Sequence, residues 1–257
     1  MIARVAVVVP GLALAAAASL GAAATPPLRP AEAVLADYAK AIGGQRAWKR
    51  HHSLHVKHEI EVAKMQMRGT AERYATSDDK VLTVTEVAKM GRFREGTDGH
   101  VFWSEDPING LRVLDGAEAE EQRIDSAWDG EIDMARQYQK VRSVPPPVDA
   151  PAGQRYECVE LIAKVAAPAI TCFDAATHLR VLQKGTHASP QGPQPYLTHF
   201  GDWRDVKGMK LAYSEEMVAG PMTLVSHLVK IDVDQPIDAK LFDLPAAVKQ
   251  QAAATGH

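Results

Sequence analysis

The sequence has 257 residues, of which 46% are hydrophobic, 29 are lysine or arginine and 32 are aspartate or glutamate, so its formal net charge is −3. This length and apolar content suffice for a folded core and exclude a disordered chain. Two cysteines are too few for a small protein built on a disulfide framework. The near-neutral charge provides no strongly basic surface, so no nucleic-acid partner is expected.

Residues 1–24 predict a cleaved signal peptide. Residues 1–4 carry one positive charge, residues 5–20 are apolar, and alanines at 22–24 supply the small side chains that signal peptidase requires. An uncleaved anchor is the alternative. Because no second apolar run in residues 25–257 approaches membrane-spanning length, we expect an exported, soluble mature chain without a transmembrane segment.

The mature chain is expected to begin with a helix and to continue as a long β region. Residues 31–42 place Val34, Tyr38 and Ile42 on one helical face, and two glycines follow them. Residues 54–62 then alternate apolar and polar side chains, which predicts a strand with one buried and one solvated face. Further strands are predicted at residues 67–75, 81–89, 92–96 and 100–104.

A second helical region is predicted after Asp115, which can cap a helix together with Glu118. Apolar side chains between Ile124 and Tyr138 form its buried stripe, and Gly130 weakens its middle, so two short helices are the alternative. Residues 144–153 contain three consecutive prolines and predict a loop inside one domain, with a domain linker as the alternative.

From residue 156 the sequence predicts almost only antiparallel strands, separated by short turns. These strands are expected at residues 156–163, 169–174, 179–187, 196–206, 209–218 and 222–233. The whole chain therefore predicts an α+β fold with mostly antiparallel β structure, about ten or eleven strands, and one domain over residues 25–257. So many antiparallel strands must close into a barrel, split into a sandwich, or be covered on one face by helices.

The two cysteines lie in neighbouring predicted strands. Cys158 and Cys172 occupy β-like runs at residues 156–162 and 169–173, and a hairpin would place them opposite each other. Oxidising compartments favour disulfides, so we expect a structural Cys158–Cys172 disulfide, with two free buried thiols as the alternative. A redox role would require a reactive pair such as Cys-x-x-Cys, which the sequence lacks.

The sequence contains none of the common catalytic or cofactor-binding motifs. A Gly-rich phosphate loop, a Gly-x-Ser-x-Gly elbow and a His-Glu-x-x-His motif are all absent. Four histidines, His51, His52, His55 and His58, cluster within eight residues, but no neighbouring ligand spacing completes a metal site. We therefore expect no catalysis, no cofactor and no bound metal, with a functional metal site at the histidines as the alternative.

Six short motifs in order along the chain resemble one family of exported bacterial proteins, the LolA/LolB-like superfamily of outer-membrane lipoprotein-sorting proteins. The resemblance extends over about residues 31–248. The motifs are Ala41-Ile42-Gly43-Gly44 with Ala47-Trp48, Gly96-Thr97-Asp98-Gly99 with Val101-Phe102-Trp103, the run from Gly110 to Gly116, Phe173-Asp174 with Thr177-His178-Leu179, the run from Asp202 to Leu211, and Phe242-Asp243-Leu244-Pro245.

The resemblance implies a strongly curved antiparallel half-barrel with helices covering its concave face. It also implies a periplasmic location and a cavity that holds a lipid, an acyl chain or the acyl chains of a lipoprotein. Burying an acyl chain provides about 0.8 kcal/mol per CH₂ group, so an apolar strand face is expected to line such a cavity. The candidate lining residues are Leu54, Val56, Ile60, Val62, Leu82, Val84, Trp103, Leu111, Val113, Val225, Val229 and Ile231.

Three functional hypotheses follow from these observations. The first is a periplasmic carrier or envelope sensor that binds a lipid or lipoprotein without catalysis. The second is an interaction module whose half-barrel is filled by its own side chains and docks on an envelope protein. The third is a periplasmic metal- or acid/base-dependent enzyme.

Overall fold

The computed structural model describes residues 27–255. The predicted signal peptide at residues 1–24 lies outside this range. Thirteen strands form one antiparallel sheet in the order β6-β5-β4-β3-β2-β1-β13-β12-β11-β10-β9-β8-β7. The strands are β1 Ser53–Val62, β2 Met67–Thr76, β3 Val81–Val87, β4 Gly91–Thr97, β5 Phe102–Asp106, β6 Gly110–Val113, β7 Lys140–Val144, β8 Tyr156–Ile162, β9 Ala169–Asp174, β10 Arg180–His187, β11 Gln194–Val206, β12 Met209–Ala219 and β13 Met222–Val233.

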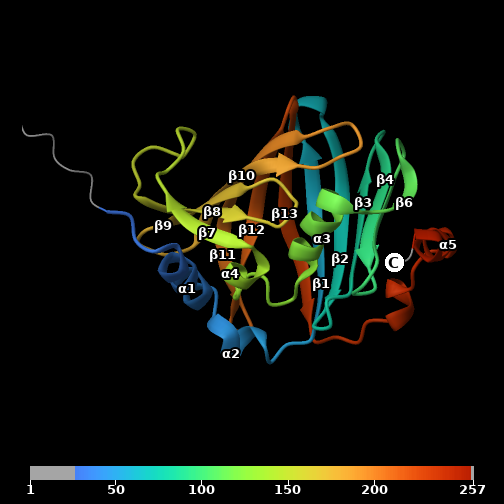
Figure 1. Ribbon diagram of the computed structural model, residues 1–257, viewed down its shortest axis with the longest axis horizontal. Helices are drawn as coiled ribbons and strands as arrows, with labels where there is room; N and C mark the ends of the chain where they lie inside the picture. Colours follow the sequence, from blue (N-terminus) through green and yellow to red (C-terminus); the bar gives the residue numbers. More distant parts are fainter. Residues whose placement is uncertain (1–26, 256–257) are drawn as a thin grey trace, which may run out of the picture.

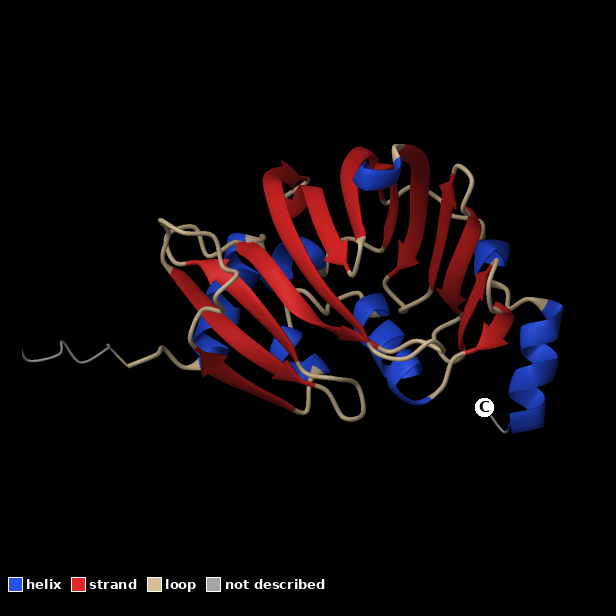
Figure 2. Cartoon of the chain, turned by 90° about the horizontal axis from the view of Figure 1, so that it is seen from above, coloured by secondary structure: helices blue, strands red, loops and turns tan. Residues whose placement is uncertain are grey.

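Helices lie on both sides of this sheet, as Figures 1 and 2 show. They are α1 Ala31–Ala41, α2 Gly44–Trp48, α3 Gly116–Ser126, α4 Met134–Gln137 and α5 Ala246–Thr255, with short 3₁₀ turns η1 Ala63–Met65 and η2 Ala239–Phe242. The sheet curves strongly around α3, whereas α5 lies outside the curve beside β6 (Figure 2). The open, curved sheet with helices on its concave face confirms the predicted half-barrel.

The chain order explains why helices cross the concave side. The chain first builds β1 to β6 outward to one edge of the sheet, and it later builds β7 to β13 inward from the other edge. The segment with α3 and α4 connects these two edges, β6 and β7. It passes across the hollow side, where the path between the two edges of a strongly curved sheet is shorter than over the convex face.

The main core fills the part of the half-barrel beneath β7 to β12. One face of α1 supplies Val34, Leu35 and Tyr38, and these side chains pack with Phe173 of β9 and Met209 of β12. Each of these five side chains is at most 4% exposed. The helical spacing predicted for residues 31–42 is therefore confirmed. The helix covers the concave face of this half of the sheet.

A second core lies on the opposite face of the sheet. There the C-terminal segment places Phe242 of η2 and Val248 of α5 against Leu82 of β3 and Trp103 of β5. The sequence had predicted strands to the end of the chain and no such helical segment. The period-two pattern identifies strands but does not show that a later segment covers their outer face.

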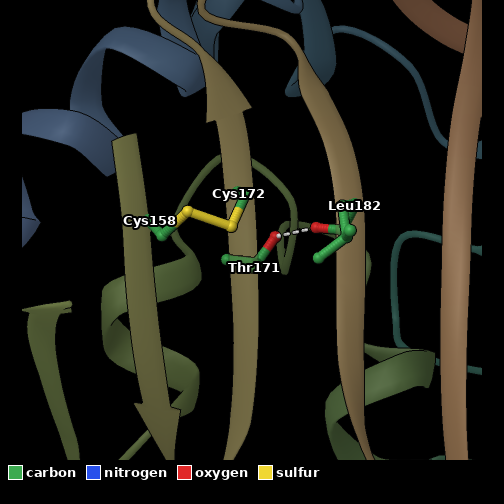
Figure 3. The surroundings of a disulfide bond; sticks show 4 residues. All are labelled: Cys158, Thr171, Cys172 and Leu182. Carbon is green, nitrogen blue, oxygen red and sulfur yellow. Dashed lines mark hydrogen bonds between the residues drawn. A yellow bond between two sulfur atoms is a disulfide. The ribbon is translucent and has the colours of Figure 1, made fainter. Parts of the chain in front are cut away.

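The predicted disulfide is confirmed. Cys158 of β8 and Cys172 of β9 stand directly opposite each other in the antiparallel register and are bonded, as Figure 3 shows. The sulfurs pack with Leu182 of β10 in a small third core. Thr171, the neighbour of Cys172, directs its hydroxyl to the Leu182 carbonyl at 3.4 Å.

The strand count differs from the prediction of ten or eleven because two edge strands were missed. β6 has four residues and β7 has five, at the lower limit of the length over which alternation indicates a strand. The predicted second helix is divided into α3 and α4, with a turn at Gly130 between them. Within residues 27–255 no helix has the length and apolar character needed to cross a membrane.

A cavity between the sheet and α3 as candidate functional site

A cavity of about 1000 Å³ lies between the concave face of the sheet and the segment that carries α3. The wall combines apolar and polar side chains from most strands of the sheet. The apolar side comes mainly from Val62, Val87, Met90, Phe93, Ile124, Leu161, Met217, Met222 and Leu224, and the polar side from Thr83, Thr85, Glu95, Ser104, Arg112, Glu121, Gln122, Asp125, Glu131, Arg180, Gln183, His187, Tyr196 and Glu215.

The strand register divides the wall into an apolar end and a polar middle. Val62, Leu224 and Met217 stand opposite one another across β1, β13 and β12. Val87 and Phe93 lie toward the same end of the half-barrel, next to the turn between β3 and β4. This end of the cavity thus offers a continuous apolar surface of the kind that binds hydrocarbon.

The polar middle is one row of residues on the concave face of five neighbouring strands, β2 to β6. Each member is the direct register partner of the next. The row runs Arg73, Thr83, Glu95, Ser104 and Arg112, and the last four border the cavity. Because every second residue of a strand shares a face, this row and the apolar end line the same hollow.

Ion pairs hold both ends of α3 over this row. At its start, Glu118 accepts two hydrogen bonds from Arg112 of β6, at 2.6 and 2.7 Å. At its end, Arg73 of β2 donates to the Asp125 carbonyl oxygen at 2.7 Å and lies 3.5 Å from the carboxylate. The helix is therefore fixed to two separate strands of the sheet.

The middle of α3 is also attached by polar contacts. Glu121 accepts a hydrogen bond from the Ala188 backbone N–H at 2.9 Å and lies 3.2 Å from His187 Nδ1, which joins the helix to the loop after β10. Gln122 donates from Nε2 to the Gly96 carbonyl of β4 at 3.3 Å. The buried residues of α3 are Gln122 and Ser126, so polar bonds rather than apolar packing hold this cover in place.

Two carboxylates on the wall, Glu95 of β4 and Glu215 of β12, form no salt bridge or hydrogen bond with any described residue. Enclosure by protein raises the pKa of both groups, and the negative charge of Asp125 adds to this. The main opposing charge is Arg73 for Glu95 and Arg180 for Glu215. Much of the Glu95 side chain nevertheless stays accessible. The space that it faces is the cavity, so it is surrounded by protein and still open to a ligand.

The structure places the apolar residues proposed as cavity lining in several different environments. Val62 borders the cavity and is 2% exposed. Val56 and Ile60 share its face of β1, but they lie outside the set of residues that border the cavity. Leu54 and Ile231 pack against the core beneath α1 and α2. Ligand contact therefore stays a prediction for Val62 alone among these five.

The other seven proposed residues lie on the outer face of the sheet. Five of them, Leu82, Val84, Trp103, Leu111 and Val113, belong to the core under the C-terminal segment. Val225 faces outward opposite Glu61, and Val229 is 50% exposed at an irregular position of β13. This is a correction with a simple cause: alternation shows which residues share a face, but it does not show which face is inside.

Sequence reasoning missed the polar residues that alternate with these apolar ones along the same strands. Thr83 and Thr85 alternate with Leu82 and Val84 along β3, and the threonines line the cavity. A polar strand face was expected to meet bulk water. Here it meets an internal hollow, a difference that the pattern of one strand cannot show.

Two of the clustered histidines, His51 and His52, contact the same carboxylate, Asp234, and the other two contact different groups. His51 lies 2.7 Å from Asp234, His55 stacks on Tyr74 with ring centroids 4.3 Å apart, and His58 lies 2.9 Å from the Ser226 hydroxyl. In residues 27–255 no three or more His, Cys, Asp or Glu side chains are grouped as a metal site.

These features define a half-barrel of the LolA-like type, and comparison with solved structures confirms this fold. A LolA superfamily protein from Nitrosomonas europaea superposes with a TM-score of 0.53 at 11% identity, covering 84% of this chain and 98% of that one. A DUF1329 family protein from Desulfovibrio piger gives a TM-score of 0.51 at 9% identity, covering 83% and 97%. No family model matches the sequence, and no curated protein does so.

Proposed function

We propose that this protein is a periplasmic lipid-binding protein that holds an acyl chain, or the acyl chains of a lipoprotein, in the cavity beneath its curved sheet. It acts as a carrier or an envelope sensor and performs no catalysis. The observation that carries the proposal is the hollow of about 1000 Å³ with an apolar end, which is large enough for a drug-sized or larger ligand.

The energetics of the apolar end support this function. Val62, Met217 and Leu224 adjoin one another there, and each CH₂ group buried against such a surface contributes about 0.8 kcal/mol. Several methylene groups therefore suffice for appreciable affinity. Methionine side chains adapt their shape to flexible chains, which suits Met90, Met217 and Met222 to this role.

The disulfide and the attachment of α3 support the location and the route of entry. A Cys158–Cys172 bond is typical of oxidising compartments such as the periplasm.

Since polar contacts attach α3, water can replace them when the helix moves, and the cavity then opens without exposing a large apolar surface. The interaction-module hypothesis is favoured only by the filled half beneath α1.

The test is native mass spectrometry of protein purified from the periplasm, combined with binding of a fluorescent fatty acid. We expect a bound mass in the lipid range that delipidation removes. Thr85→Trp should fill the cavity and reduce probe affinity at least tenfold, because Thr85 borders it.

The matched control is Glu86→Trp, which places the same side chain on the outer face of the same strand. It should bind the probe like the unaltered protein. Absence of any lipid-range mass together with equal probe binding by both variants would contradict the proposal.

A further inference from the structure

The polar middle of the cavity has a surplus of negative charge around Glu95 and, beside it, two polar side-chain atoms without a hydrogen-bond partner in the described chain. Glu95 stands between Thr83 of β3 and Ser104 of β5 in the sheet register. Gln122 of α3 lies beside it, bonded to the carbonyl of Gly96, the next residue of β4. Strand pairing makes Thr83, Glu95 and Ser104 neighbours, and the passage of α3 across the hollow brings Gln122 to them.

Gln122 is oriented so that its acceptor remains free. A carbonyl oxygen only accepts hydrogen bonds, so the amide nitrogen must face the Gly96 oxygen and Oε1 must be the other atom. Gln122 is 9% exposed, borders the cavity, and its Oε1 has no hydrogen-bond partner in residues 27–255. The buried Ser104 Oγ likewise has no partner in the described chain.

The charges nearby do not supply the missing donors. Arg112 is engaged by Glu118, Arg73 by Asp125, Arg180 by Glu131, and His187 by Glu121. Each of these cations thus has its own carboxylate, and Glu95 and Glu215 are left without an ion pair, although Glu215 lies in the field of Arg180. Two donor atoms, Arg112 Nε and Arg180 Nε, are buried without a hydrogen-bond partner in residues 27–255, but both belong to guanidinium groups whose charge is already paired. A buried acceptor without a donor costs roughly 1–3 kcal/mol. A bound group that donates hydrogen bonds and carries a positive charge would therefore satisfy the unpartnered acceptors and balance the charge of Glu95.

We propose that the cavity takes an amphiphile whose polar end is a protonated primary amine, seated against Glu95, Ser104 and Gln122. This inference rests on the proposed function and specifies the ligand class of the same site. An ammonium group has three N–H donors and one positive charge, which matches one carboxylate and two neutral acceptors. The apolar tail then extends toward Val62 and Leu224.

A carboxylate or phosphate end fits this position poorly. It would lie beside Glu95 and within the field of Asp125, and like charges brought together in an enclosed site repel strongly. An alcohol end would provide one donor and no charge. Comparing ligands that carry these three head groups on the same alkyl chain therefore separates the effect of head-group charge on affinity from the effect of the chain.

The experiment compares dodecylamine, dodecanol and dodecanoate, each below its critical micelle concentration, by displacement of a fluorescent fatty probe at pH 7.5. On the unaltered protein we expect dodecylamine to bind at least tenfold more tightly than dodecanol, and dodecanoate to bind most weakly. Glu95→Gln keeps the shape of the side chain and should reduce the advantage of the amine to about threefold or less. Glu86→Gln, on the outer face of β3, should leave it unchanged.

Stability measurements separate this effect from damage to the fold. Because the enclosed site raises the pKa of Glu95, its charged form destabilises the empty protein, and Glu95→Gln should melt at the same or a higher temperature than the unaltered protein. The combination of unchanged or higher stability with lost amine preference is not expected of a structural residue.

The outcomes also separate this inference from the proposed function. If none of the three probes binds, the proposed function fails and the inference fails with it. If the unaltered protein binds all three with equal affinity, or prefers dodecanoate, the cavity binds chains but the amine inference is overturned. Full amine preference in Glu95→Gln would overturn the assignment to Glu95.

Discussion

Arg180 and Glu131 form a salt bridge, with 2.9 Å between Nη2 and Oε1, at the boundary between the filled and the hollow parts of the half-barrel. Both residues border the cavity. Tyr38, which belongs to the core beneath α1, donates its hydroxyl hydrogen bond to the other oxygen of Glu131. The pair therefore connects the core to the cavity wall.

Glu131→Gln should destabilise the fold, because it removes the carboxylate paired with the guanidinium of Arg180, 14% exposed, and leaves the more distant charge of Glu215 as its counter-charge. The expected loss is about 2 kcal/mol in the free energy of unfolding, measured by urea denaturation. Glu86→Gln is the control, since its pair with Arg92 has side chains that are 63% and 58% exposed and should contribute less than about 1 kcal/mol. Equal losses in the two variants would contradict this reading of the boundary.

Replacing both Cys158 and Cys172 by alanine should lower stability without affecting the cavity. The disulfide closes a loop with a sequence separation of 14, for which the chain-entropy model gives roughly 3 kcal/mol. The bond lies on the outer face of the sheet, packed with Leu182, so affinity for the fluorescent probe should stay within about twofold. Unchanged denaturation midpoints would show that the disulfide contributes little.

Phe242→Ala should expose how strongly the C-terminal segment is anchored. Phe242 is 6% exposed and packs against Leu82 and Trp103, so its truncation should cost about 3 kcal/mol and change Trp103 fluorescence. The neighbouring Leu241 is 39% exposed, and Leu241→Ala should cost about 0.5 kcal/mol or less. Similar costs for the two would refute the anchoring role.

Stability should fall on mild acidification partly through His58. Burial, and then the positive charge of Arg73, lower the pKa of His58 below its usual 6.5. Between the usual and the lowered pKa the unfolded chain binds the proton and the folded chain does not, so stability decreases as pH falls through this window. His58→Gln should therefore lose less stability than the unaltered protein between pH 7.5 and 5.5, whereas the exposed His100→Gln should lose as much.

Glu121→Ala should loosen α3 over the cavity, because it removes the contacts of the helix with Ala188 and His187. Stopped-flow release of a bound fluorescent fatty acid should become about tenfold faster, as expected when about 1.4 kcal/mol of closing free energy is lost. Glu61→Ala is the control, since Glu61 is exposed on the outer face of β1, away from α3. Equal release rates for the two variants would argue that α3 is not the moving cover.

The local features of this protein could be predicted from its sequence because they depend on neighbours along the chain. Alternation predicted β1 and most other strands, helical spacing predicted α1, and the Cys158–Cys172 pair followed from its place in a hairpin. The ordered turn motifs indicated the curved half-barrel. Each of these depends on periodicity or on turn chemistry within a few residues.

The tertiary structure decided which face of the sheet became the inside. Leu82 and Thr83 are adjacent in β3; the apolar one lies under the C-terminal segment and the polar one lines the cavity. That choice depends on where α3 and α5 pack, and both come from distant parts of the chain. A single strand specifies two faces, while the long-range packing of the covering segments assigns one to the core and the other to the ligand cavity.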